Sequence, residues 1–207
     1  RQAIGFSADI KKAGEQSDIL KHVRSEDLIA YGFESEFVGR LPVRTVFEKL
    51  TEEDLYSILK NPNNPVILGK KLDFAAYGID VKFQDEALRL LADNAAEENT
   101  GARGLVSAVE RALLLFEKRL PSTNVRAFPV TAAVIHDPES ALEALTSTGG
   151  DTGDRRLDKT FKTLIREEKG YIRQYLKANV KSLAEKHGVT MTPSRIDIVA
   201  AYYAKHP

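Results

Sequence analysis

The amino-acid sequence predicts an α+β fold that ends in a basic helical tail. Several segments carry apolar residues at three- and four-residue intervals, as amphipathic helices do, and shorter segments alternate apolar with polar residues, as strands do. The charge is also unevenly distributed, although the 207 residues carry 30 Lys/Arg and 30 Asp/Glu. Residues 155–207 hold 12 basic and 5 acidic residues, a net +7, which leaves a net −7 on residues 1–154. This asymmetry predicts two modules with different partners, or one acidic surface that receives a basic arm.

The N-terminal third predicts two helices and a strand. Ser25-Glu26-Asp27-Leu28 is typical of a helix start, because a serine cap and acidic residues suit the positive end of the helix dipole. Residues 43–47 are mostly β-branched or aromatic and predict a short strand. Thr51-Glu52-Glu53-Asp54 has the spacing of a capping box and predicts another helix. That helix should end in residues 61–65, where two prolines and three asparagines predict a hinge.

The middle of the chain predicts a second small α+β unit. Alternation over residues 79–83 predicts a strand, and Asp85 is expected to cap the helix that follows. Residues 99–101 should break that helix, and Pro121 should end the next one. Residues 130–135 are predicted to form another strand. The hinge therefore separates two predicted domains, residues 1–62 and residues 66–138.

The remaining residues predict a linker and a helical extension. Residues 139–154 are assigned to the linker, because 146–154 contain no large apolar side chain. The extension, residues 155–207, is expected to form an amphipathic helix or a helix pair interrupted at Gly170. Thr192-Pro193 should begin a final helix.

Composition excludes several classes of site. The chain has no cysteine, which excludes disulfides, thiolate zinc sites, iron–sulfur clusters and a cysteine nucleophile. Its four histidines are dispersed, so no metal site is predicted. No apolar run is long enough to cross a bilayer, and we expect a cytoplasmic protein with no membrane partner. The chain begins at Arg1 rather than methionine, which suggests a fragment.

Specific strings carry a resemblance to a known family. They are Glu36-Phe37-Val38-Gly39-Arg40-Leu41-Pro42, Leu50-Thr51-Glu52-Glu53 and Thr100-Gly101-Ala102-Arg103-Gly104-Leu105. In this order and separation they resemble the ClpX family of AAA+ protein unfoldases, from Asp27 to about Pro121. The resemblance implies that residues 1–62 are the C-terminal part of an AAA+ large domain and that 66–138 are the small (lid) domain. It does not cover the extension.

The resemblance assigns roles to two arginines. Arg40 matches the arginine finger, which reaches a nucleotide held by a neighbouring subunit. Arg103 matches the sensor-2 arginine, which contacts phosphates bound to its own subunit, with Gly101 and Gly104 allowing a close approach. A guanidinium suits the charge that develops on a transferring phosphoryl group, and a helix start favours anions. The alternatives are a turn with a solvated arginine for Arg40 and an ordinary helix start for Arg103.

Ile4-Gly5-Phe6 matches a third motif of the family, a loop that docks into apolar clefts of the ClpP peptidase ring. Two apolar anchors on a polar loop can form a binding hot spot, and repetition around a ring adds avidity. The alternative is an apolar loop end packed into the chain's own core.

The expected function is that of the C-terminal portion of a ClpX-like AAA+ ATPase, which unfolds proteins and delivers them to a ClpP-like peptidase. The sequence contains no Gly-x-x-x-x-Gly-Lys-Ser/Thr motif, so ATP and Mg²⁺ are expected in the intact homo-hexamer and not on this fragment. Substrates would be unfolded or tagged proteins. The alternative is a non-catalytic interaction or adaptor module. Nucleic-acid binding by the extension is not expected, because Ser194 stands where a helix-turn-helix requires an apolar residue and because aromatic and basic residues are not interleaved.

Overall fold

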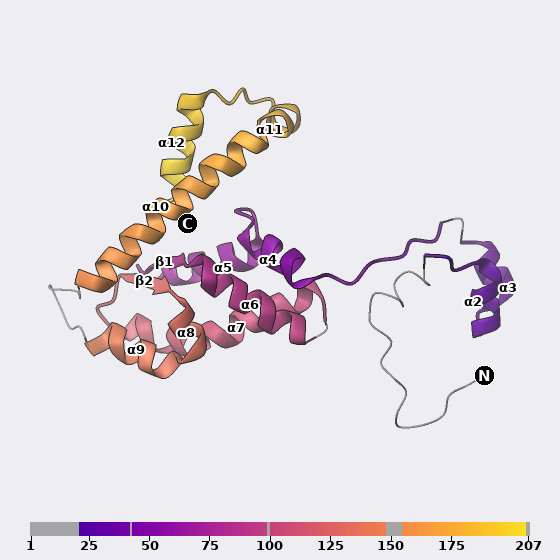
Figure 1. Ribbon diagram of the computed structural model, residues 1–207, viewed down its shortest axis with the longest axis horizontal. Helices are drawn as coiled ribbons and strands as arrows, with labels where there is room; N and C mark the ends of the chain where they lie inside the picture. Colours follow the sequence, from indigo (N-terminus) through magenta and orange to yellow (C-terminus); the bar gives the residue numbers. More distant parts are fainter. Residues whose placement is uncertain (1–20, 42, 99, 148–154, 206–207) are drawn as a thin grey trace. The chain divides into compact units, whose positions relative to one another are not determined.

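The computed structural model describes residues 21–41, 43–98, 100–147 and 155–205, with the backbone alone for 155–157 (Figure 1). The chain divides into two compact units, Arg1–Lys49 and Leu50–Pro207, and each is described by itself. In the described ranges, no helix is both long and apolar enough to span a membrane. The Ile4-Gly5-Phe6 motif lies outside the described residues.

The first unit contains two short helices, α2 (Ser25–Tyr31) and α3 (Ser35–Gly39). The predicted helix start is confirmed, but the cap is Arg24, whose backbone N–H donates to Asp27 Oδ2 over 2.8 Å. Aromatic rings stack along this unit, with centroids 6.1 Å apart for Tyr31 and Phe33 and 6.2 Å apart for Phe33 and Phe37.

The strand predicted at residues 43–47 is wrong, because the described residues 43–51 adopt neither helix nor strand. Phe47 in this segment is 87% exposed and Val43 is 75% exposed. The preference of β-branched and aromatic residues for strands comes mainly from packing on neighbouring strands and a buried face. Neither is available to this segment among the described residues, so its composition does not produce a strand.

The second unit is built on two parallel strands, β1 (Asp80–Phe83) and β2 (Ala127–Val130), paired from Asp80 opposite Ala127 to Phe83 opposite Val130. Their connection contains α6 (Asp85–Glu97), α7 (Ala102–Arg119) and the 3₁₀ turn η1 (Leu120–Ser122). The strand expected at 79–83 is thus confirmed. The strand expected at 130–135 is wrong: β2 ends at Val130, and α8 (Ala132–His136) follows. Alanine favours helix, and the Ala132 N–H donates to the Gln84 side chain instead of continuing a ladder.

The hinge predicted at residues 61–65 lies inside the second unit. It is a turn between α4 (Glu52–Lys60) and α5 (Pro65–Ala75), and both helices bury side chains in one core. Thr51 caps α4 as predicted, and Asn64 caps α5 by accepting from the Val66 and Ile67 N–H groups at 2.8 and 3.2 Å. The prolines therefore position a helix start, and the division between units follows Lys49 instead.

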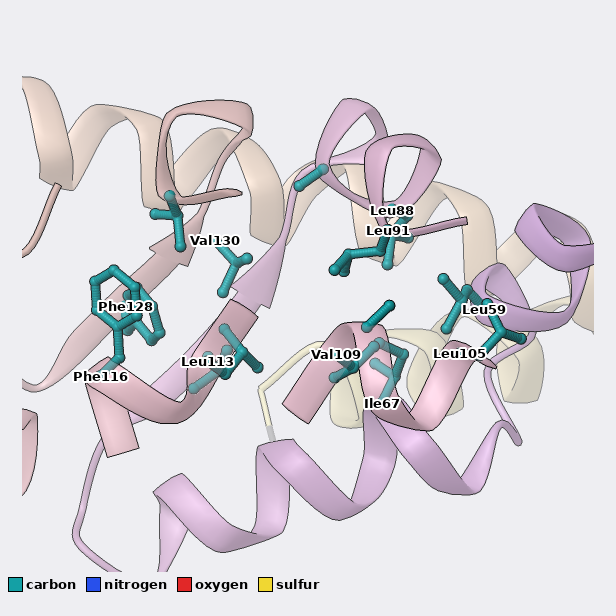
Figure 2. Packing of buried hydrophobic residues seen from close by; sticks show 14 of the residues in the cluster. Leu59, Ile67, Leu88, Leu91, Leu105, Val109, Leu113, Phe116, Phe128 and Val130 are labelled. Atoms are coloured by element: carbon teal, nitrogen blue, oxygen red, sulfur yellow. The ribbon is translucent and has the colours of Figure 1, made fainter. Parts of the chain in front are cut away.

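The core of the second unit lies between the sheet and its helices (Figure 2). Phe128 on β2 is central: its ring centroid is 4.8 Å from that of Phe116 on α7 and 5.5 Å from that of Phe74 on α5. Leu59 on α4 and Leu91 on α6 extend the same core toward the start of α7. The core therefore fixes the position of α7 from several sides.

The linker and extension differ from the sequence-based expectation in two places. Residues assigned to a linker form α9 (Pro138–Ser147), and its Leu145 is buried in the main core. In addition, α10 (Arg155–Ala178) runs unbroken through Gly170, so no helix break occurs there. Glycine costs a helix only about 1 kcal/mol, which the packing of the apolar face of α10 outweighs.

The extension packs against the two-stranded sheet of the same unit. Phe161 and Leu164 of α10 are buried, and α10 packs against β1 and β2. The C-terminal half of α10 forms a second core with α11 (Val180–His187) and α12 (Pro193–Tyr203). The members of that core are Ile172, Leu176, Ile196 and Ala200. Gly188, with a φ of 64°, is the C-cap of α11, and Thr192 caps α12 as predicted.

Two buried lysines hold the extension against the sheet. Lys82 on β1 is 1% exposed, and its Nζ lies 3.2 Å from Glu168 Oε2 of α10 and 3.3 Å from Asp80 Oδ1. Lys71 of α5 donates to Glu168 Oε1. The Lys82–Glu168 pair is close but lacks hydrogen-bond geometry, so it is a Coulombic contact. In these ion pairs the lysines belong to residues 1–154, whose net charge is negative, and the glutamate belongs to residues 155–207, whose net charge is positive. The contact therefore does not follow the net charges of the two segments.

Candidate functional site

The start of α7 has the geometry that the sequence predicted for residues 100–105. Gly101 is the N-cap residue, with φ 64° and ψ −143°, a backbone conformation that L side chains rarely adopt. Thr100 and Gly101 thereby turn the chain from the end of α6 into the first turn of α7. A glycine at position 101 is therefore required by the backbone itself.

Gly104 is required for a different reason, the close approach of α7 to the end of α6. A Cβ atom at this position would lie 2.8 Å from the carbonyl oxygen of Ala95 and 3.0 Å from Thr100 Oγ1. A backbone oxygen cannot move away as a flexible side chain can. The absence of a side chain at Gly104 therefore sets the distance between the two helices beneath Arg103.

Arg103 lies in the first turn of α7 with its side chain exposed. Among the described residues it forms no hydrogen bond or ion pair, so its guanidinium is available to a ligand. The first turn of α7 contains no acidic residue that would neutralise the positive end of the helix dipole. The free backbone N–H groups, the dipole and the guanidinium together favour an anion such as a phosphate group. The residues present thus fit the triphosphate of a nucleotide.

Arg40 lies at the C-cap of α3, in the first unit. Its Nη2 is 2.9 Å from Glu36 Oε1, and both side chains are 79% exposed. An exposed pair four residues apart in a helix contributes only ~0.3–0.5 kcal/mol. Glu36 therefore orients the guanidinium without binding it tightly, and Arg40 can exchange this carboxylate for another anion at small cost.

Arg40 belongs to the first unit and Arg103 to the second. In the described part of the chain, no group of three or more His, Asp or Glu side chains could hold a metal ion. The candidate site residues are therefore the Gly101–Gly104 turn with Arg103 in the second unit, and Arg40 in the first.

A polar cluster between α4 and α6 was missed by the sequence analysis. Asp85 Oδ1 accepts from the Tyr56 hydroxyl and from Lys60 Nζ, each over 2.5 Å. The guanidinium of Arg89 covers the Tyr56 ring, 3.9 Å from its centroid. Lys60 Nζ also lies 5.1 Å from the centroid of the Tyr171 ring on α10. Asp85 had been interpreted only as a helix cap, and the i,i+4 spacing of Tyr56 and Lys60 was the available signal.

The interactions within this cluster shift the pKa values of Asp85 and Lys60. Burial raises the pKa of the Asp85 carboxyl, but the hydrogen bonds from Lys60 and Tyr56 outweigh it and hold the pKa below the ordinary value of 3.8. Burial lowers the pKa of Lys60, and the hydrogen bonds to Asp85 and Tyr56 outweigh it and raise that pKa. The charged Asp85–Lys60 pair is therefore stabilised by folding. This pair joins α4 to α6, and Lys60 also contacts the Tyr171 ring on α10.

Comparison with known proteins points to one family. Residues 50–116 match the family described as the C-terminal, D2-small domain of ClpB protein. The chain is 37% identical over 125 residues to the ATP-dependent Clp protease ATP-binding subunit ClpX of Treponema denticola. It is 40% identical over 126 residues to the subunit of the same name from Borrelia duttonii.

These alignments cover 59% and 60% of this chain but 30% and 29% of the relatives, so the chain spans less than a third of their length. The family match begins at residue 50, where the second compact unit also begins. The helices and the small parallel sheet agree with the α+β fold predicted from the sequence. Residues 50–116 are therefore similar to the small domain of ClpB, and the chain is similar to part of ClpX.

Proposed function

We propose that this chain is the C-terminal portion of a ClpX-like AAA+ ATPase. The intact protein would form a homo-hexamer that hydrolyses ATP, unfolds tagged or unfolded protein substrates and passes them to a ClpP-like peptidase. The observation that carries the proposal is the turn at the start of α7. There, two glycines with distinct backbone requirements position an exposed arginine without a partner among the described residues.

In this proposal Arg103 acts on the nucleotide bound by its own subunit. Its guanidinium and the N–H groups of the first turn of α7 would contact the nucleotide phosphates, and Gly101 would give those N–H groups room. ATP with Mg²⁺ supplies the phosphoryl group that is transferred to water. The chain has no Walker A sequence, so the phosphate cradle must come from another part of the intact protein.

Arg40 is proposed to act on a neighbouring subunit's nucleotide. Its exposed guanidinium, which among the described residues pairs with the equally exposed Glu36, would stabilise the negative charge that develops during hydrolysis. The Ile4-Gly5-Phe6 motif would supply the contact with the peptidase. Arg40 and Arg103 would therefore act on different nucleotides, and this difference can be tested by mixing subunits.

The test uses the full-length protein and mixed hexamers. Arg40→Ala and Arg103→Ala should each depress ATP hydrolysis, whereas Arg111→Ala, an exposed arginine further along α7, should not. Each variant is then mixed with subunits whose own P-loop is disabled. An Arg40→Ala subunit keeps an intact P-loop and can receive a wild-type finger from its neighbour, so activity should partly return. The Arg103→Ala mixture should recover nothing, because every working P-loop then lacks its own sensor arginine.

Four outcomes would contradict the proposal. Equal rescue of both variants would remove the distinction between the arginines, as would rescue of neither when mixed hexamers demonstrably form. A full-length protein that hydrolyses no ATP would instead favour the non-catalytic adaptor. Turnover by residues 1–207 alone, above a buffer control, would contradict the assignment of the phosphate cradle to another part of the protein.

A further inference from the structure

The long helix of the extension is α10 (Figure 1). A row of basic residues follows its exposed side. We call it the α10 basic row, and its members are Lys159, Lys162, Arg166, Lys169, Arg173 and Lys177. All six are exposed. At 3.6 residues per turn, these positions fall within an arc of roughly 80° and extend over ~27 Å of helix. The row is therefore narrow, straight and spaced at about one cation per helical turn.

Most of this charge is not neutralised within the described part of the chain. Lys162 pairs with Asp158 over 2.6 Å, and Arg173 pairs with Asp197 of α12 over 2.7 Å. The side chains of the other four members of the row form no hydrogen bond or ion pair among the described residues. The remaining acidic residues of α10 lie off the row, and one of them, Glu168, is committed to the buried lysines.

The surroundings of the row discriminate between possible partners. The apolar face of α10 is already buried: Phe161 is buried near its N-terminal end, and Ile172 is buried in the second core. Beside the row on its solvent side lie small or polar residues, Thr163, Gly170 and Gln174, all exposed. Protein interfaces need buried aromatic or apolar anchors and are depleted in lysine. A phosphate backbone needs neither, and hydroxyl and amide side chains can donate to it.

We propose that the α10 basic row binds the phosphate backbone of nucleic acid without reading its sequence. The expectation against DNA binding rested on the missing helix-turn-helix pattern around residues 184–194 and on the absence of interleaved aromatic and basic residues. Backbone binding by α10 requires neither, because phosphate contacts need neither a recognition helix nor base stacking. The net −7 of residues 1–154 opposes binding at long range. At 0.1 M salt, however, charges beyond about 10 Å are largely screened, and the row's own charge then dominates.

The test measures binding of the 207-residue chain to a labelled duplex of about 30 base pairs by fluorescence anisotropy. Four unneutralised cations predict a slope of about −3.6 in log affinity against log salt, which is a loss of roughly 150-fold between 50 and 200 mM. Duplexes of unrelated sequence should bind equally, because phosphate contacts carry no sequence information. A sequence preference above tenfold, or no binding at 50 mM salt, would overturn the proposal.

Paired variants localise the contact. Arg166→Gln/Lys169→Gln removes the centre of the row, and Lys118→Gln/Arg119→Gln removes the same charges from the exposed end of α7. The first pair should reduce the salt slope by about 1.8, and the control pair should leave it unchanged. Equal effects would show that net charge alone is responsible. Poly-glutamate and anionic lipid vesicles are measured in parallel. Tighter binding to either than to DNA, lost in the first pair alone, would assign the row to an acidic protein or a membrane and overturn the nucleic-acid proposal.

Discussion

Replacing Gly104 by alanine tests whether close approach of α6 and α7 builds the site. The added Cβ would lie 2.8 Å from the Ala95 carbonyl oxygen, whereas ordinary van der Waals contacts begin at 3.4 Å, so the helices must separate by about 0.6 Å. Overpacking of this kind costs about 1–3 kcal/mol. Alanine in place of glycine also favours helix by about 0.5–1 kcal/mol. The net destabilisation should therefore be about 0–2.5 kcal/mol.

Gly170→Ala is the matched control, because Gly170 also lies inside a helix but has no atom within 4 Å of its would-be Cβ. This variant should gain about 0.5–1 kcal/mol. The free energies of unfolding of both variants are measured by urea denaturation followed by circular dichroism. Their difference removes the shared helix preference and should be about 1–3 kcal/mol. A difference below about 0.5 kcal/mol, or a stabilised Gly104→Ala chain, would refute the packing argument.

Three further predictions concern the extension, the polar cluster and the N-terminal motif. Glu168→Gln should destabilise the chain by about 3 kcal/mol, because Lys71 and Lys82 lose their shared carboxylate. The control is Glu167→Gln at the exposed neighbouring position, which should change the free energy of unfolding by less than about 0.5 kcal/mol in the same urea assay. For Asp85→Asn, the lowered pKa of Asp85 means that its contribution to stability is complete above pH 3.8 and is lost as pH falls through the lower folded pKa. The stability deficit of this variant should thus be constant near neutral pH and shrink in acid, and a deficit that grows below pH 3.8 would contradict the shift. In the full-length protein, replacing Ile4 and Phe6 of the Ile4-Gly5-Phe6 motif by alanine should abolish ATP-dependent proteolysis and preserve ATPase activity; equal loss of both would indicate a folding role.

Local signals in the sequence determined much of the secondary structure. Thr51 and Thr192 carry hydroxyls that cap helices, and Gly188 accepts the left-handed conformation that ends α11. Each is a short-range effect between a residue and its immediate backbone, so a single sequence reveals it. The start of α7 at Gly101 belongs to the same class. The helix start that presents Arg103 could therefore be predicted locally, whereas the choice of Arg103 as a candidate ligand-binding residue came from the resemblance to the ClpX family.

Tertiary packing decided the features that the sequence misplaced. Residues 43–47 have the composition of a strand but no described partner, and the strand predicted at residues 130–135 is replaced after Val130 by α8. The turn at 61–65 resembles a domain boundary locally, yet Leu59 and Ile67 on either side enter one core. Likewise, net charge predicted that a basic tail would meet an acidic domain, whereas Glu168 meets two buried lysines. Which residues are buried, and which residues they pair with, depends on contacts between positions that can be about 100 residues apart, as for Lys71 and Glu168. No local sequence pattern indicates such a contact.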